Sequence, residues 1–150
     1  MPILQFHLVA SAYPQAAMAR LLEEASLFYA AALYPELSPP PVGRVRTFVN
    51  DIAPDLWATG GVPVSRGGAA APYFTCLSLK GRPPDQLQRL LAGLTEITAH
   101  ALGIDAALVR GQLIEIEPAH WCIGGTPASQ ARAGEISARA GPGAGQATAR

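Results

Sequence analysis

Apolar residues form short strand-like runs in some parts of the chain and follow a helical period in others, and each change of pattern marks a new element. Residues 2–9 are apolar apart from Gln5 and His7, the pattern of a short buried strand. Residues 15–33 place their apolar side chains on one helical face, and Tyr34-Pro35 must end that helix. A second strand is predicted over residues 44–52. The first part of the chain therefore predicts a strand, a helix and a strand.

The same order of elements then returns. Residues 72–79 again begin with a proline and predict a buried strand. Residues 84–102 predict an amphipathic helix that ends at Gly103, where a C-terminal glycine is expected. A further strand is predicted over residues 108–116. The chain thus resembles a duplication of one supersecondary unit.

The spacing of a few residues supports the duplication. Arg46 lies 11 residues before Trp57, and Gly60-Gly61 follows that tryptophan after two residues. Arg110, Trp121 and Gly124-Gly125 repeat this spacing. Close backbone turns are expected at both glycine pairs, which have neither the spacing nor the lysine of a phosphate loop. These observations predict an α+β fold of two βαβ units in tandem.

The predicted architecture is a four-stranded sheet, mainly parallel within each unit, with two helices on one face. One domain is expected over residues 1–132, built from repeats 2–66 and 72–132. Residues 133–150 are rich in Ala, Gly and Ser, so we expect a flexible tail there.

Composition narrows the function further. The 150 residues carry 11 basic and 11 acidic side chains, which gives no reason to expect a nucleic-acid or membrane partner. Lys80 is the single lysine, which disfavours Schiff-base chemistry, whereas arginines for carboxylate recognition are plentiful. The two cysteines, Cys76 and Cys122, have no metal-ligand spacing, so no metal is expected. Without a spanning or secretory segment, the expected location is cytoplasmic.

Pro2 is the first candidate for chemistry. If the initiator methionine is removed, its nitrogen becomes a free secondary amine at the start of a buried strand. Burial and nearby cations lower the pKa of such an amine toward neutrality, so it could serve as a general base.

The amino-terminal proline, the arginines and the aromatic before Gly-Gly together resemble a known family. Each half is similar to a 4-oxalocrotonate tautomerase subunit, and residues 2–132 resemble a fused, double-length member of the tautomerase superfamily. That superfamily includes cis-3-chloroacrylic acid dehalogenase and malonate semialdehyde decarboxylase. The resemblance implies a cofactor-independent enzyme that acts on a small carboxylate substrate and assembles as a homotrimer.

The resemblance also implies roles for particular residues. Pro2 matches the family's catalytic proline, whereas the nitrogen of Pro72 lies in a peptide bond and cannot act as a base. Arg82 matches the arginine that follows the first strand of a unit, a position that Ala12 fills in the first repeat. Arg46 and Arg110 match the strand arginine, and one of them is expected to come from a neighbouring chain.

Other side chains are candidates for substrate binding. Trp121 and Trp57 match the aromatic of the family's apolar pocket, and Trp121 is the expected wall beside Pro2. Tyr29 lies near the dehalogenase's histidine position, although packing is the more frequent role for such a residue. Glu115 and Glu117 lie near that enzyme's water-activating glutamate.

Three functions follow from the resemblance. The first is an isomerase that transfers a proton between the keto and enol forms of a 2-keto or 2-hydroxydienoic acid. The second is a lyase-type relative that hydrates, dehalogenates or decarboxylates a short acid, with an ionised Glu115 or Glu117 near Pro2. The third is a non-catalytic trimeric module that binds small acids, which retention of Met1 would favour.

Overall fold

A computed structural model describes residues 2–141. In its first half, β1 (Ile3–Val9) is followed by α1 (Gln15–Leu33) and β2 (Arg46–Ile52). Burial alternates along β1, where Leu4, Phe6 and Leu8 face the helix and are fully buried. The first unit is therefore the predicted strand, helix and strand.

The second half repeats this order with β5 (Tyr73–Leu79), α2 (Pro84–Leu102) and β6 (Arg110–Ile116). The α2 helix begins with a proline and ends at Gly103, whose φ of 66° lies in the left-handed region. The second strand of each unit begins later than the sequence predicted, because a single 3₁₀ turn precedes it. The Val45 and Val109 amides bond back into those turns at 2.9 and 3.0 Å.

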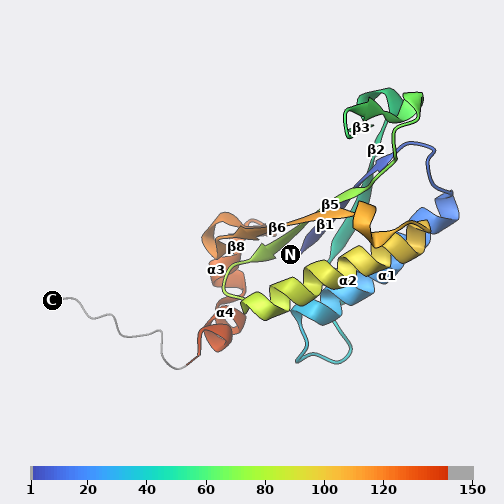
Figure 1. Ribbon diagram of the computed structural model, residues 1–150. Coiled ribbons are helices and arrows are strands. Elements are labelled where there is room, and N and C mark those ends of the chain that lie inside the picture. Colours follow the sequence, from blue (N-terminus) through green and yellow to red (C-terminus); the bar gives the residue numbers. More distant parts are fainter. Residues whose placement is uncertain (1, 142–150) are drawn as a thin grey trace.

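The four long strands form one sheet in the order β2-β1-β5-β6. Pairing is parallel within each unit and antiparallel between β1 and β5, where the units meet. Both long helices lie side by side across one face of this sheet (Figure 1). The predicted α+β fold is confirmed.

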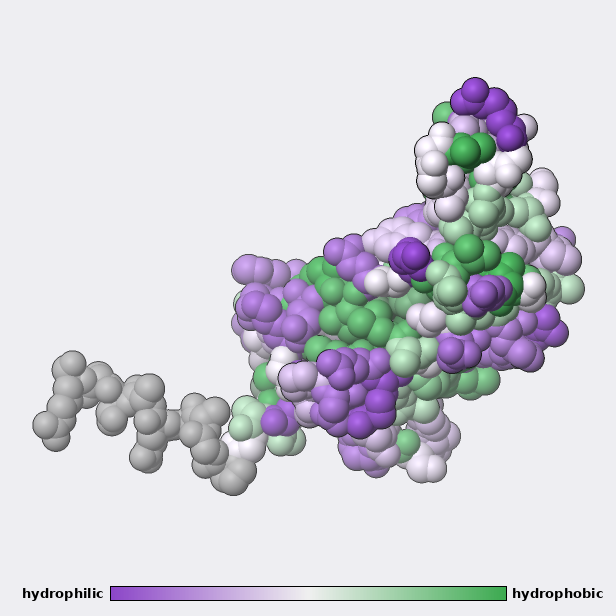
Figure 2. Space-filling view, in the orientation of Figure 1, coloured by the Kyte–Doolittle hydropathy of each residue, from purple (hydrophilic) through white to green (hydrophobic). Residues whose placement is uncertain are grey.

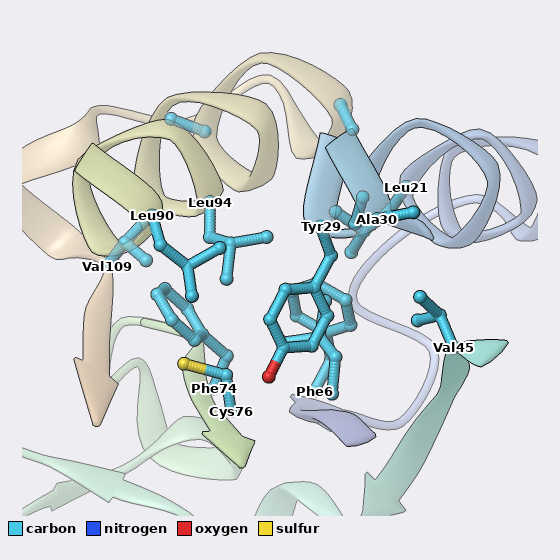
Figure 3. Close-up of a cluster of buried hydrophobic side chains, with 14 of the residues drawn as sticks. Phe6, Leu21, Tyr29, Ala30, Val45, Phe74, Cys76, Leu90, Leu94 and Val109 are labelled. Carbon is cyan, nitrogen blue, oxygen red and sulfur yellow. The ribbon is translucent and has the colours of Figure 1, made fainter. Parts of the chain in front are cut away.

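The core fills the space between the helices and the sheet (Figure 3). Tyr29 and Leu21 of α1 and Leu90 and Leu94 of α2 are fully buried there above the strands. Burying each such side chain contributes about 1.5–3 kcal/mol. The two units therefore share one core and form a single folded body.

Short elements complete the chain. The 3₁₀ turns are η1 (Val42–Arg44), η2 (Pro54–Leu56), η3 (Val64–Arg66), η4 (Ala106–Leu108) and η5 (Pro118–His120). The short strands are β3 (Ala58–Thr59), β4 (Val62–Pro63), β7 (Cys122–Ile123) and β8 (Thr126–Pro127). Two further helices are α3 (Ala128–Ala131) and α4 (Ala133–Ala140). The β3–β4 and β7–β8 pairs are hairpins whose two turn residues are the Gly-Gly pairs. All four glycines have φ between 57° and 85°, which only glycine adopts readily.

The carboxyl-terminal part differs from expectation. Residues 133–140, which the sequence placed in a flexible tail, form α4, and its Glu135 accepts hydrogen bonds from Arg44. Amino-acid composition cannot reveal this ion pair, because Arg44 and Glu135 lie 91 positions apart in the sequence. Residues 142–150 of the predicted tail lie outside the described residues. Among residues 2–141, no helix is both long and apolar enough to cross a membrane.

Candidate active site

Pro2 is buried at the start of β1, where the antiparallel register places it beside the end of β5. The amino terminus accordingly lies next to the carboxyl ends of β5 and β6 (Figure 1). A cavity of about 20 Å³ opens there, enough for roughly one water molecule. It is lined by Pro2, Leu33, Tyr34, Leu77, Ser78, Leu79, Arg82, Ile116 and Trp121.

The turn after β5 brings Arg82 to this cavity. The amide of Lys80 bonds the Ile116 carbonyl at 2.9 Å, and Gly81 then reverses the chain with a φ of 98°. Nε of Arg82 donates to the Ser78 hydroxyl at 3.1 Å, and Nη1 donates to the Leu33 carbonyl. The guanidinium is therefore held by groups from two different elements before any ligand arrives.

The charge of Arg82 is only partly compensated. The residue is 8% exposed, and among residues 2–141 it forms no ion pair with a carboxylate. Its guanidinium carbon lies 5.3 Å from the Tyr34 ring centre, a cation–π contact. Burial, and next the charge of Arg139, lower the pKa of Arg82 below its ordinary value. A buried cation of this kind favours an anionic ligand.

Trp121 forms another wall of the cavity. Its main-chain carbonyl accepts the Ala128 amide at 2.7 Å, which fixes the start of the β7–β8 hairpin. The indole Nε1–H is buried and has no acceptor among the described residues. Trp121 can thus offer a hydrogen-bond donor as well as an apolar surface.

The two strand arginines lie at opposite ends of the sheet. The Arg46 amide donates to the Pro2 carbonyl at 3.0 Å, but its side chain is exposed and bonds the carbonyls of Gly43 and Val45. Arg110 pairs with Tyr73, which faces His7, five residues along β1 from Pro2. That separation is roughly 17 Å at 3.4 Å per residue. Within one chain, Arg110 is not brought to the Pro2 cavity.

Trp57 and Arg110 instead line a second cavity at Pro72, of about 410 Å³. Its frame repeats the first site, because the Arg110 amide donates to the Pro72 carbonyl at 3.1 Å. The Pro72 nitrogen is an amide and has no basic lone pair. The pseudo-equivalent cavity therefore lacks the feature that makes Pro2 a candidate base.

Like Trp57, two further predicted substrate-binding residues do not line the Pro2 cavity. Tyr29 is fully buried in the core, and its hydroxyl donates to the Leu77 carbonyl. Burial raises the pKa of the Tyr29 phenol, with the neighbouring Cys76 as the next cause. Glu117 pairs with Lys80 at the surface, and this partner raises the pKa of the lysine.

The sequence reasoning missed several residues that build the cavity. Tyr34 entered it only as the end of a helix, and Ser78 and the Leu33 carbonyl carried no recognisable signal. Their roles depend on the turn at Gly81, which returns Arg82 toward residues four and 49 positions away. Only the left-handed glycine between Lys80 and Arg82 hinted at such a turn.

Comparison with known proteins identifies a family to which part of the chain is similar. The family model described as "Tautomerase enzyme" matches residues 72–131. The second repeat of the chain is therefore similar to the tautomerase family over this segment. No curated protein matches the chain by sequence.

Several solved structures share the fold of this chain. A fused 4-OT described as a wild-type symmetric trimer is 23% identical, with a TM-score of 0.71 over 86% of this chain and 98% of its own. A protein solved after inactivation by 2-oxo-3-pentynoate is 20% identical, with a TM-score of 0.72 over 85% and 97%. A member of the cis-3-chloroacrylic acid dehalogenase family is 14% identical, with a TM-score of 0.67 over 92% and 98%.

The likeness to these structures extends over both repeats of the chain. The cavity described above combines a buried strand-initial proline, a buried arginine and an indole at one end of the sheet. Within residues 2–141, no group of three or more His, Cys, Asp or Glu side chains gathers as metal ligands do.

Proposed function

We propose that this protein is a cofactor-independent tautomerase acting on a small 2-keto or 2-hydroxydienoic acid, with the amine of Pro2 as general base. The proposal requires removal of Met1, so that the Pro2 nitrogen is an amine. The observation that carries it is the buried Arg82 guanidinium beside Pro2, which forms no ion pair with a carboxylate of residues 2–141. A substrate carboxylate is the natural counterion for such a group.

The proton transfer follows from these positions. The lone pair of Pro2 takes a proton from the carbon next to the keto group, and the electrons of the broken C–H bond move into an enolate. Arg82 binds the substrate carboxylate, and the Trp121 indole N–H donates to the enolate oxygen. The protonated amine then returns its proton at the other end of the conjugated system. Donors already in place cost no reorganisation during the reaction.

The lyase alternative needs a carboxylate that activates water near Pro2. Neither Glu115 nor Glu117 is among the residues that line the cavity, and Glu117 is engaged by Lys80. Both observations favour proton transfer over hydration.

Exposed apolar side chains support the proposed trimer. Phe48 of β2 and Ile114 of β6 are 39% and 37% exposed, and Leu56 beside the first hairpin is 80% exposed. On the face that Figure 2 shows, hydrophobic surface is bordered by hydrophilic residues. Assembly would cover these side chains and would supply Arg110 from a neighbouring chain.

The decisive test compares two forms of the protein that differ only at the amino terminus. Mass spectrometry first establishes that the mature form begins at Pro2. Deuterium exchange at C3 of 2-oxopentanoate, followed by NMR, then reports proton abstraction directly. The processed form should catalyse exchange, whereas a form that keeps a residue ahead of Pro2 should not, because its nitrogen is an amide. Equal rates for the two forms would remove Pro2 from the mechanism.

A covalent probe gives independent support. The relative inactivated by 2-oxo-3-pentynoate makes this compound a suitable reagent for the present protein. We expect one adduct per chain, located on the peptide that begins with Pro2. Modification at Cys122 alone, the exposed thiol, would indicate simple surface alkylation.

A further inference from the structure

Tyr34 lies at the carboxyl end of α1, beside the Pro2 cavity. Its amide donates to the Ala30 carbonyl at 3.0 Å, and its own carbonyl accepts the Leu37 amide at 3.0 Å. The residue is 7% exposed and lines the cavity together with Pro2 and Arg82. Main-chain bonds on both sides therefore fix the place from which the Tyr34 ring projects.

Three guanidinium groups gather around this ring. The guanidinium carbons of Arg44, Arg82 and Arg139 lie 5.0, 5.3 and 5.9 Å from its centre, which is the range of a cation–π contact. Glu135 pairs with Arg44 and Arg139 at 3.1 and 3.6 Å, but one carboxylate cannot neutralise three cations. The group keeps a net positive charge, so its guanidinium groups repel one another.

Arg82 has a carboxylate close by with which it does not pair. Arg82 and Glu36 both line a cleft of about 640 Å³ between α4 and the first turn of α2 (Figure 1). Burial, and next the charge of Arg139, lower the pKa of Arg82, and the charge of Glu36 opposes them. No salt bridge joins Arg82 to Glu36 within residues 2–141. The Arg82 cation thus has two possible counterions, a ligand carboxylate at Pro2 and Glu36 in the cleft.

The partners that Arg82 does have are all uncharged. Its Nε donates to the Ser78 hydroxyl at 3.1 Å, its Nη1 donates to the Leu33 carbonyl, and the Tyr34 ring contacts the guanidinium carbon. The π face of a ring attracts a cation without taking up its N–H donors, whereas a carboxylate would bind those donors directly. The ring can therefore hold Arg82 in place and still leave it able to bind an anion.

We propose that Tyr34 is a positioning residue for the Pro2 site, whose ring holds the Arg82 guanidinium beside Pro2 in place of a carboxylate and so keeps that cation for the substrate. The inference rests on the proposed function, because Arg82 is assigned there to the substrate carboxylate. Tyr34 acts through Arg82 and takes no part in proton transfer. Without the aromatic ring, we expect Arg82 to turn toward Glu36 and to bind the substrate less tightly.

Fluorination tests the ring itself, because it weakens the π face with little change in shape. Tyr34→Phe, and phenylalanine analogues with one or three fluorine atoms placed at Tyr34, form the series. Deuterium exchange at C3 of 2-oxopentanoate gives kcat and KM, and calorimetry gives the dissociation constant. Tyr34→Phe should stay within about twofold of the wild type in KM. Both KM and the dissociation constant should rise with each addition of fluorine, by about threefold or more at three atoms, while kcat stays within about twofold.

A second pair of variants tests the competing carboxylate. Tyr34→Leu removes the ring and should raise KM by about tenfold. Adding Glu36→Gln, which removes the alternative counterion, should restore most of that loss. The same trifluorinated side chain placed at Tyr13 is the control, because the Tyr13 hydroxyl donates to the Ala70 carbonyl and the residue does not line the Pro2 cavity. It should leave KM unchanged. Urea unfolding of each form shows that the folded protein is compared throughout.

The outcomes separate this inference from the proposed function. The inference is overturned by a KM and a dissociation constant that do not change along the fluorinated series, which stands even where Tyr34→Leu fails to fold. A tenfold loss in Tyr34→Phe also overturns it, because the hydroxyl and not the ring would then be responsible, as does a Tyr34→Leu defect that Glu36→Gln leaves in full. Dissociation constants that follow the fluorine atoms without deuterium exchange in any form support the inference and overturn the proposed function. A wild type that does not bind 2-oxopentanoate overturns both.

Discussion

Tyr29→Phe removes one hydroxyl and thereby separates packing from catalysis. The Tyr29 side chain is fully buried, and its hydroxyl points from α1 toward the sheet, where it donates to the Leu77 carbonyl (Figure 3). Phenylalanine keeps the ring and its contacts but leaves that carbonyl without this donor. The loss should cost about 1–2 kcal/mol of unfolding free energy. For a chain of this size, the midpoint of thermal unfolding should fall by roughly 2–8 °C.

The pH dependence of stability provides a second readout. Burial raises the pKa of Tyr29 in the folded state, whereas the phenol of the unfolded chain ionises near about pH 10. Above that pH the unfolded state binds fewer protons than the folded state, so the wild type loses stability as pH rises. Tyr29→Phe lacks this group and should lose less stability over the same range. At neutral pH the folded phenol stays protonated and cannot serve as a base.

Urea unfolding at neutral pH and above pH 10, together with deuterium exchange on 2-oxopentanoate, tests this reasoning. We expect kcat/KM of Tyr29→Phe to stay within about twofold of the wild type. Tyr13→Phe is the matched control, because its hydroxyl also donates to a main-chain carbonyl but is only half-buried. It should cost less than Tyr29→Phe. A tenfold fall in kcat/KM at unchanged stability would instead place Tyr29 in the chemistry.

Two further predictions concern packing and assembly. A Cβ on Gly111 would lie 2.2 Å from the fully buried Phe74 ring, so Gly111→Ala should lower the free energy of unfolding in urea by about 1–3 kcal/mol. Gly134 has open space around it, so Gly134→Ala should raise that free energy by about 0.5–1 kcal/mol. Equal stability of the two variants would refute the steric argument. Arg110→Gln should lower kcat/KM by about tenfold or more, because the Arg110 guanidinium is proposed to enter a neighbouring chain's site, and sedimentation of the variant should still give a trimer. Full activity in this variant, or a wild type that sediments as a monomer, would contradict that proposal.

The long elements could be predicted because local signals agreed with the global fold. Apolar spacing and the proline and glycine stops gave the bounds of α1 and α2 as the structure has them. The Gly-Gly pairs indicated tight turns because few other residues accept a positive φ at two successive positions. The hairpin strands on either side went unpredicted because each has two residues, too few for a period to appear.

The cavity could be predicted only in part. Pro2, Arg82 and Trp121 line one cavity, since the repeat and its register bring their elements to one end of the sheet. The sequence carried no sign that Tyr34 lines this cavity, where three guanidinium groups from distant segments make cation–π contacts with its ring. Nor did sequence reasoning find α4, a short helix in an Ala- and Gly-rich segment whose Glu135 pairs with the distant Arg44.

The two repeats preserve the same turn after their first strand, although only the second carries an arginine there. Ser11 has a φ of 63° and Gly81 a φ of 98°, so both units enter the left-handed region one residue before Ala12 or Arg82. The preceding amides also match, with Ala10 bonding Ile52 at 2.8 Å and Lys80 bonding Ile116 at 2.9 Å. The turn of the second unit brings Arg82 to the cavity at Pro2, whereas Ala12 is not among the residues that line the cavity at Pro72.

The two units differ in the chemistry at their strand-initial prolines, Pro2 and Pro72. At Pro72 the nitrogen is an amide, and Ala12 holds the position in its turn that Arg82 holds in the other, so the first unit supplies neither a base nor a cation there. At Pro2 the facing position holds Arg82, and release of the amino terminus alone would supply the base. Under the proposed function, a single active site per chain requires no change in the duplicated backbone, because an amide in place of an amine and an alanine in place of an arginine remove both the base and the cation at Pro72.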